Sequence, residues 1–222
     1  MIRAGNVRSR GAEGGLRLFD TSTRELLQRL GSATLHEAQG RYGALPPGIR
    51  PVAGPPFLVG SAFTVRARPG DNLALHHALA LANPGDVLVI DCGGFEHAGV
   101  WGEVMTVSAI VRKLGGLVVD GAVRDIAQIN TLGFPVFSRG ISMVGTSKGD
   151  SGILQETLHW DGASIEPGDL VGGDLDGIVV IKQGEVETVI SAALEREKNE
   201  QKMMQQLANG ATTIEVMNLP RP

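Results

Sequence analysis

The amino-acid sequence predicts an α/β protein with one main domain. Apolar runs of strand length alternate along the chain with helix-like segments, the pattern of an α/β sheet. The chain has 31 glycines but only 4% aromatic residues, which fits a turn-rich α/β protein better than an aromatic-rich β-sandwich. Its 222 residues suffice for a substantial core. We expect residues 21–210 to form this domain, with a loose arm at 1–20 and a tail at 211–222.

Composition excludes several classes of function. A net charge of −4 with 20% charged residues does not indicate a nucleic-acid surface. The single cysteine, Cys92, excludes an intrachain disulfide and any multi-cysteine metal site, and its position at a strand end favours a small buried hydrophobe over a nucleophile. No apolar run is long enough to span a membrane, so we expect a soluble, cytoplasmic protein that binds neither nucleic acid nor membrane.

Two short helices are expected near the start of the domain. Residues 22–25 have the form of a capping box, and leucines follow on one helical face until Gly31 stops the helix. A second short helix begins near Thr34. Residues 41–56 are rich in Gly and Pro and predict a long connection.

The middle of the chain predicts a βαβ unit. Residues 63–67 alternate between apolar and polar side chains, which predicts a half-buried strand, and residues 70–72 then open a helix. Residues 87–91 form a continuous apolar run, typical of a strand buried on both faces. A helix from about Gly102 and a strand at Leu117 follow, so the connection between the two strands should be right-handed.

The last part of the domain predicts a short strand at 135–137 and a long helix at 184–207. The helix has an apolar stripe followed by a glutamate-rich stretch, which on its own reads as a solvated face with salt bridges. In the tail, Ile214 and Val216 suggest an edge strand.

An acid and base cluster follows these strands. Asp120 and Asp125 flank Arg124, and all three follow an apolar run, so we expect them at the carboxyl edge of the sheet, where open α/β sheets bind ligands. Oxygen ligands of this kind suit Mg²⁺ or Mn²⁺, whereas a guanidinium suits a carboxylate or an enolate. The same residues also fit a turn, a helix start and a surface ion pair.

Two further features would complete a ligand site there. The backbone amides near Glu103, Val104 and Met105 lie at a helix start and could bind a substrate carboxylate. Glycines at 93 and 94 permit close approach of the backbone to a ligand. His76 is either a polar lining residue or a partly exposed helix histidine.

The spacing of Glu103, twenty intervening residues, and Arg124-Asp125 resembles the signature of the RraA-like family, which includes the 4-hydroxy-4-methyl-2-oxoglutarate / 4-carboxy-4-hydroxy-2-oxoadipate aldolases. Other pieces match in order from about Thr34 to Ile181: Gly70, Asp71, Asn72 and His76, then 84–91, Asp120-Gly121, 135–137, 167–169 and 173–180. The chain departs from the aldolases at Glu103, where they usually carry Asp.

The resemblance implies a layered α/β/β/α sandwich like that of the swivelling phosphohistidine domain. It also implies a divalent-metal-dependent aldolase that releases pyruvate from 4-hydroxy-2-oxo acids with a further carboxylate and decarboxylates oxaloacetate as a side activity. Asp125 would hold Mg²⁺ or Mn²⁺, with Glu103 acting through water, and Arg124 would bind substrate and neutralise charge. The implied substrate-binding residues are Asn72, His76, Gly102, Glu103, Val104, Met105 and Arg124.

The family further implies a homo-oligomer, a trimer or hexamer, in which Glu195, Glu197 or Glu200 reaches a neighbouring site. Lys148 and Lys182 are the candidate lysines for a rival Schiff-base mechanism. A non-enzymatic regulator that inhibits a ribonuclease is the second hypothesis for function. A methyltransferase ranks third, because the adjacent glycines at 93 and 94 replace the Gly-x-Gly of that motif.

Overall fold

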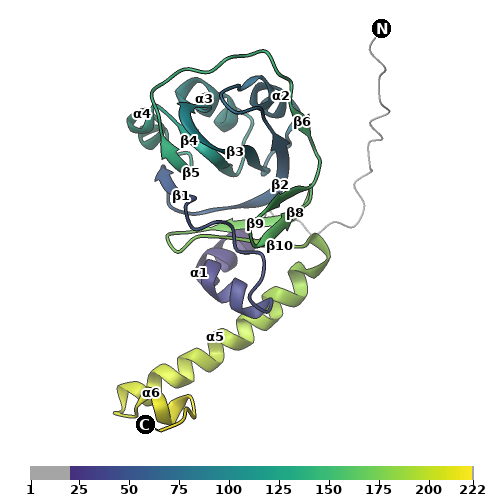
Figure 1. Cartoon of the computed structure of the whole chain (residues 1–222). Helices are drawn as coiled ribbons and strands as arrows, with labels where there is room; N and C mark the ends of the chain where they lie inside the picture. Colours follow the sequence, from purple (N-terminus) through teal and green to yellow (C-terminus); the bar gives the residue numbers. More distant parts are fainter. Residues whose placement is uncertain (1–20, 222) are drawn as a thin grey trace.

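A computed structural model describes residues 21–221, and the expected arm at 1–20 lies outside the described residues. The described chain forms four layers, helices on sheet on sheet on helices (Figure 1). The helices and strands are α1 (Thr21–Ala38), β1 (Arg50–Ala53), β2 (Leu58–Arg66), α2 (Leu73–Leu81), β3 (Val87–Gly99), α3 (Glu103–Val111), β4 (Gly116–Val123), α4 (Ile126–Leu132), β5 (Val136–Ile141), β6 (Ile153–Leu154), β7 (Leu158–Trp160), β8 (Ala163–Ile165), β9 (Leu170–Gly173), β10 (Ile178–Ile181), the 3-10 turn η1 (Gln183–Glu185), α5 (Val186–Ala208) and α6 (Thr213–Val216).

The main sheet has the strand order β1-β5-β4-β3-β2-β9-β10, with β6 paired to β2. The strands β2, β3, β4 and β5 run parallel to one another. The pairs β1–β5, β2–β6, β2–β9 and β9–β10 are antiparallel. The strand β2 belongs to both halves, because its first residues pair with β9 and its last residues pair with β3. The sheet therefore curls into two packed layers joined through β2.

The first of three apolar clusters lies between the parallel strands and the helices α2, α3 and α4. Leu88 and Ile90 of β3 and Leu117 of β4 face these helices, and all three side chains are fully buried. Because every residue of β4 is buried, this strand is covered on both faces. Because β3 and β4 pair in parallel and α3 lies between them in the chain, the predicted βαβ unit is confirmed.

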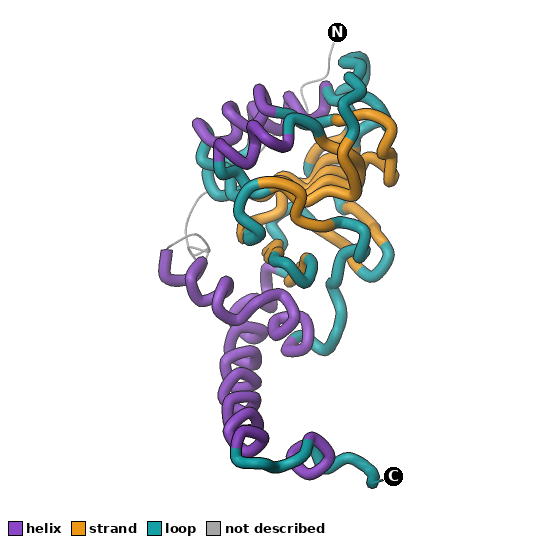
Figure 2. The backbone as a smooth tube through the Cα atoms, turned by 90° about the vertical axis from the view of Figure 1, so that its left-hand side faces the viewer, coloured by secondary structure: helices purple, strands orange, loops and turns teal. Residues whose placement is uncertain are grey.

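Two more apolar clusters separate the remaining layers of the sandwich. The opposite faces of β3 and β4, with Val89 and Val118, pack on the side of β10 that carries Val180. The other side of β10, with Val179, packs on Val186 and its neighbours from α1 and α5. These helices lie beyond the strands, on the outside of the second sheet (Figure 2). Four layers separated by three apolar clusters confirm the expected α/β/β/α sandwich.

The structure corrects several sequence predictions. The strand expected as half-buried at 63–67 runs from 58 to 66 and is buried on both faces, because helices cover one side and the second sheet the other. The connection at 41–56 contains β1. The third strand continues past residue 91 as far as Gly99. The tail forms the helix α6 rather than an edge strand, since Thr212 and Glu215 make a capping box.

The helices outside the sheets match expectation in outline. Gly31 interrupts α1 with non-helical backbone, φ 75° and ψ 160°, so the predicted break is confirmed, although Ser22, expected to cap the helix, lies inside it. The long C-terminal helix is confirmed as α5, and only its first part is buried, through Val186, Val189 and Ala193. No helix of the described chain combines the length and apolarity needed to cross a membrane.

Candidate functional site

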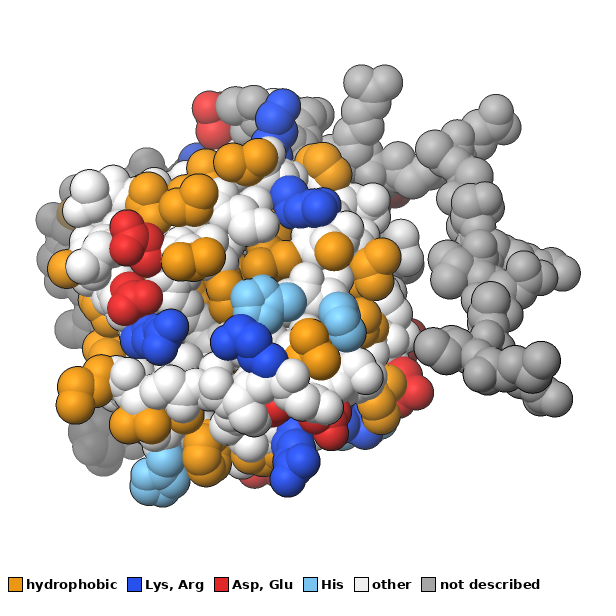
Figure 3. Space-filling model, turned by 90° about the horizontal axis from the view of Figure 1, so that it is seen from above, with side chains coloured by type: hydrophobic (Ala, Val, Ile, Leu, Met, Phe, Trp, Pro, Cys, Tyr) orange, Lys and Arg blue, Asp and Glu red, His pale blue; other side chains and the backbone are white. Residues whose placement is uncertain are grey.

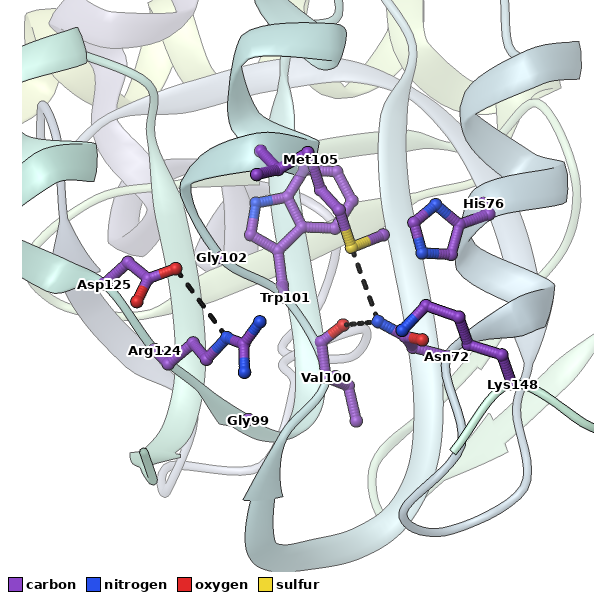
Figure 4. A pocket seen from close by; sticks show the side chains of 11 residues that line it. Asn72, His76, Gly99, Val100, Trp101, Gly102, Met105, Arg124, Asp125 and Lys148 are labelled. Carbon is purple, nitrogen blue, oxygen red and sulfur yellow. Dashed lines mark hydrogen bonds and ion pairs between the residues drawn. The ribbon is translucent and has the colours of Figure 1, made fainter. Parts of the chain in front are cut away.

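A cavity of about 230 Å³ opens at the carboxyl ends of β3 and β4, between the first turns of α2 and α3 (Figure 4). One of its sides carries Arg124 and Asp125, which follow β4 directly. The residues that line the cavity are Asn72, His76, Gly99, Val100, Trp101, Gly102, Val104, Met105, Arg124, Asp125 and Lys148. Most of the expected site residues thus share one cavity at the expected edge of the sheet.

Arg124 and Asp125 are held in place by the loop before α3. The Arg124 amide donates to the Trp101 carbonyl at 2.9 Å, and the Glu103 amide donates to Asp125 Oδ2 at 3.0 Å. Asp125 has a left-handed backbone, φ 59°, which Asp tolerates better than most residues. Arg124 Nε lies 3.7 Å from Asp125 Oδ2, so the arginine guanidinium and the aspartate carboxylate lie side by side at the cavity.

The close approach of these chain segments requires glycine at position 102. A Cβ atom on Gly102 would overlap the Asp125 carboxylate and would lie 3.2 Å from Arg124 Cγ. The absence of a side chain therefore leaves room for the two charged groups.

The start of α3 supplies fewer free donors than expected. The Glu103 amide already donates to Asp125, so it is not available to a bound anion. The expected anion site is therefore limited to the amides of Val104 and Met105, which have no acceptor within the helix. The Glu103 side chain is exposed and is not among the residues that line the cavity. It can reach a ligand only from the rim.

Asn72 and His76 line the other side of the cavity. The Asn72 side-chain amide nitrogen donates to the Val100 carbonyl at 3.0 Å and contacts Met105 Sδ at 3.6 Å. Within the described chain, Asn72 Oδ1 and His76 Nε2 are buried and have no hydrogen-bond partner. Burial, with the nearby charges of Lys148 and His77, lowers the pKa of His76, so its imidazole is neutral at physiological pH.

Trp101 forms the rigid base between the two sides. Its indole nitrogen donates to Thr106 Oγ1 at 2.8 Å, and the Thr106 hydroxyl donates to the Gly102 carbonyl at 3.0 Å. The indole also stacks on Phe134, with ring centroids 6.3 Å apart. These contacts fix the turn that presents Gly102 and the first residues of α3 to the cavity.

Asp120 of β4 and the glycines at 93 and 94 of β3 were expected near this site and do not line it. Asp120 is buried on β4, two residues after Val118 and so on the same face of the strand, and it forms an ion pair with Arg139. The glycines at 93 and 94 are likewise not among the lining residues. Burial, with the charges of two neighbouring aspartates, raises the pKa of Cys92 to about 12, in agreement with the prediction of a buried hydrophobe.

Among the two candidate lysines, only Lys148 reaches the cavity. Although burial opposes it, hydrogen bonds to Asp169 and Glu166 raise the pKa of Lys182, which makes it a poor Schiff-base nucleophile. Sequence reasoning did not place Lys148 among the binding residues. Its only signal was its position between Ser147 and Gly149, small residues that can bond a neighbouring segment.

The three C-terminal glutamates lie on α5 and line no part of this cavity. Glu197 forms an ion pair with Arg29 of α1. Glu200 pairs with Arg196 on the same helix, at 2.9 Å. Any role for them at a site of this kind would require a second copy of the chain.

The cavity fits a sparsely coordinated divalent cation rather than a closed metal cage. No three Asp, Glu, His or Cys side chains of residues 21–221 converge to hold a metal. Asp125 nevertheless offers a carboxylate at the cavity wall, and Mg²⁺ commonly binds through one or two carboxylates while water and substrate supply its other ligands. Asp125 is thus the residue that would hold the ion.

These features define a class of protein, an α/β/β/α sandwich with a small-ligand cavity at the carboxyl ends of its parallel strands. In this cavity an arginine side chain and an aspartate carboxylate lie side by side. The model of the RraA-like family, described as Aldolase/RraA, matches residues 18–180. The chain belongs to the RraA-like family.

Individual relatives agree with this assignment. A putative 4-hydroxy-4-methyl-2-oxoglutarate aldolase of Halalkalibacterium halodurans is 35% identical over 75% of this chain and 79% of its own length. The crystal structure of an uncharacterized protein from Pseudomonas syringae pv. tomato is 30% identical, with a TM-score of 0.77 over 91% of this chain and 95% of that one. RraAS2 of Streptomyces coelicolor, an unusual member of the RNase ES inhibitor RraA family, is 27% identical, with a TM-score of 0.72 over 84% of this chain and 98% of that one.

Proposed function

We propose that this protein is a divalent-metal-dependent lyase that releases pyruvate from 4-hydroxy-2-oxo acids with a further carboxylate and also decarboxylates oxaloacetate. The observation that carries the proposal is the pair of Arg124 and Asp125 in one cavity with the free amides at the start of α3. The similarity to putative 4-hydroxy-4-methyl-2-oxoglutarate aldolases supports the substrate class.

Cleavage of such an acid requires stabilisation of a pyruvate enolate. A bound divalent cation would supply Lewis-acid polarisation of the keto and carboxylate oxygens. The amides of Val104 and Met105 would orient the first carboxylate, and Arg124 would neutralise the charge that develops on the enolate oxygen. Glu103, at the rim, would move a proton through water.

Metal dependence tests this proposal. Pyruvate release is measured from 4-hydroxy-4-methyl-2-oxoglutarate and from oxaloacetate, first in excess chelator and then with Mg²⁺ or Mn²⁺. We expect chelator to abolish both reactions and either metal to restore them. Full activity in chelator, together with trapping of substrate on a lysine by borohydride, would overturn the mechanism.

We further propose that the active unit is a trimer or hexamer with the site at a subunit boundary. The second half of α5 extends away from the sheets (Figure 1). Met204 on this part of the helix is 59% exposed. On α3, Val104, Val107 and Val111 present an exposed apolar stripe beside the cavity. Contacts between such surfaces of different copies would close a ring and bring Glu195, Glu197 or Glu200 to a neighbouring cavity. Light scattering at assay concentration tests this arrangement, and a fully active monomer would exclude it.

A non-enzymatic regulator of a ribonuclease is the second candidate function. Its support is the similarity to RraAS2, together with a face on which exposed apolar side chains surround acidic, basic and histidine side chains (Figure 3). A protein-binding role needs a contact surface and no reaction in the cavity. Inhibition of ribonuclease activity that survives Arg124→Ala, without any pyruvate release by the unsubstituted protein, would favour the regulator.

A further inference from the structure

A second positively charged side chain, that of Lys148, lies on the side of the cavity opposite Arg124 (Figure 4). Lys148 lies there with Asn72 and His76 (Figure 4). Asn72 is only 6% exposed, and its Oδ1 atom is a buried acceptor without a donor in the described chain. A buried acceptor of this kind costs free energy unless a ligand or water supplies a donor. The cavity thus has two polar ends, each with one positively charged side chain.

Lys148 is exposed, but its backbone is fixed from both sides by one buried carboxylate. Asp71, which is 3% exposed, accepts hydrogen bonds at Oδ2 from the Ser147 hydroxyl at 2.6 Å and from the Gly149 amide at 2.7 Å. Its Oδ1 accepts from the Leu73 amide at 3.0 Å, at the start of α2. The carboxylate therefore ties the two neighbours of Lys148 to the helix that carries His76.

Backbone bonds reinforce this attachment. The Ser147 amide donates to the Gly70 carbonyl at 2.9 Å, and the Asn72 amide donates to the Ser147 carbonyl at 3.1 Å. Burial alone would raise the pKa of Asp71, but its hydrogen bonds outweigh burial and hold the pKa well below its usual range. Asp71 is thus ionised at physiological pH and can accept all of these bonds.

We propose that Lys148, positioned by Asp71, binds the second carboxylate of the substrate, and that Asn72 Oδ1 accepts a hydrogen bond from the hydroxyl on the same carbon. A lysine ammonium only donates and suits a carboxylate, whereas a carbonyl oxygen only accepts and suits a hydroxyl. A 4-hydroxy-2-oxo acid with a carboxylate on carbon 4 presents both groups together. This inference rests on the proposed function and defines the far end of the substrate as an α-hydroxy carboxylate.

Calorimetry with two non-reacting analogues tests the inference. Binding of 2-oxoglutarate, which has a second carboxylate, is compared with binding of 2-oxopentanoate, which lacks it, in buffer with Mg²⁺. We expect the unsubstituted protein to prefer 2-oxoglutarate and Lys148→Met to weaken that ligand alone, by about tenfold or more. Lys148→Arg should retain part of the preference. Lys113→Met, a change at an exposed residue just after the C-terminal end of α3 and outside the lining of the cavity, is the charge-matched control and should behave like the unsubstituted protein.

Asp71→Asn tests the positioning role. It should reduce the preference for 2-oxoglutarate while leaving 2-oxopentanoate binding intact, because Lys148 is displaced and Arg124 is not. A purely structural role for Asp71 would weaken both ligands alike and would overturn this part of the proposal.

Equal binding of the two ligands by the unsubstituted protein, or equal weakening of both by Lys148→Met, would overturn the carboxylate subsite. The proposed lyase activity fails separately, if no 2-oxo acid yields pyruvate. A Lys148-dependent preference for 2-oxoglutarate would support the subsite even in that case.

Discussion

Replacement of Gly102 by alanine probes the geometry of the site with a single methyl group. The new Cβ atom would overlap the Asp125 carboxylate and crowd Arg124, so the carboxylate has to move and the hydrogen bond from the Glu103 amide is lost. A displacement of about 1 Å at a reacting centre costs on the order of a hundredfold in rate. We therefore expect kcat/KM for oxaloacetate decarboxylation to fall about a hundredfold, equivalent to about 2.7 kcal/mol.

Gly184→Ala is the matched control. A Cβ atom on Gly184 meets no atom within 4 Å, and its backbone is not left-handed, so the same substitution should leave activity unchanged there. Both variants are compared by kinetics at saturating Mg²⁺ and by thermal unfolding. A folded Gly102→Ala protein whose kcat/KM stays within about threefold of the unsubstituted value would refute the placement of the reaction beside Asp125.

Three further predictions concern the roles of Asp125 and Arg124, the buried Asp71 carboxylate and the subunit boundary. Asp125→Ala should lose Mg²⁺ affinity, as measured by calorimetry. Arg124→Ala should keep that affinity and lose about 3 kcal/mol of transition-state stabilisation, a hundredfold or more in rate. Near-normal activity in both folded variants would contradict these roles. Because the folded-state pKa of Asp71 is lowered, its ionised form stabilises the fold above its unfolded value of about 4, and this contribution is lost as pH falls through the folded-state pKa. Asp71→Asn should thus cost about 2 kcal/mol in urea unfolding at pH 7, a difference that shrinks in acid; a cost independent of pH would argue against it. Mixing Asp125→Ala chains with chains substituted at the correct glutamate of α5 should restore some activity if the site is shared and the subunits exchange, whereas mixtures that stay inactive despite demonstrated exchange would count against sharing.

The βαβ unit could be predicted because its signals are local. The strands β3 and β4 are continuous apolar runs, and such runs indicate burial on both faces without knowledge of what covers them. The strands β6, β7 and β8 have only two or three residues each, too few to show a period, and their pairing depends on contacts from distant segments. The half-buried prediction for β2 was wrong because the sequence does not show that a second sheet covers its polar face.

The site could be predicted in part for a similar reason. Arg124 and Asp125 follow an apolar strand directly, so their place at the sheet edge follows from the chain itself. Period-two alternation would have placed Asp120 on the face of Val118, inside the sandwich, and so would have excluded it from the site. The position of Lys148 depends on the hydrogen bond between its neighbour Ser147 and the Asp71 carboxylate, 76 residues earlier in the chain. A contact between such distant residues leaves no periodic pattern in the sequence from which it could be predicted.

The membership of β2 in both layers has a consequence for how the chain reaches its native state. The segment 58–61 stays an unpaired edge until β9 has been synthesised, because Ser61 pairs with Leu170 and Leu58 pairs with Gly173. Such sequence-distant pairing slows folding, and open strand edges promote association between incomplete chains. A nascent chain that ends before β9 therefore exposes an edge of β2 that the complete chain covers, and this edge adds to its risk of aggregation.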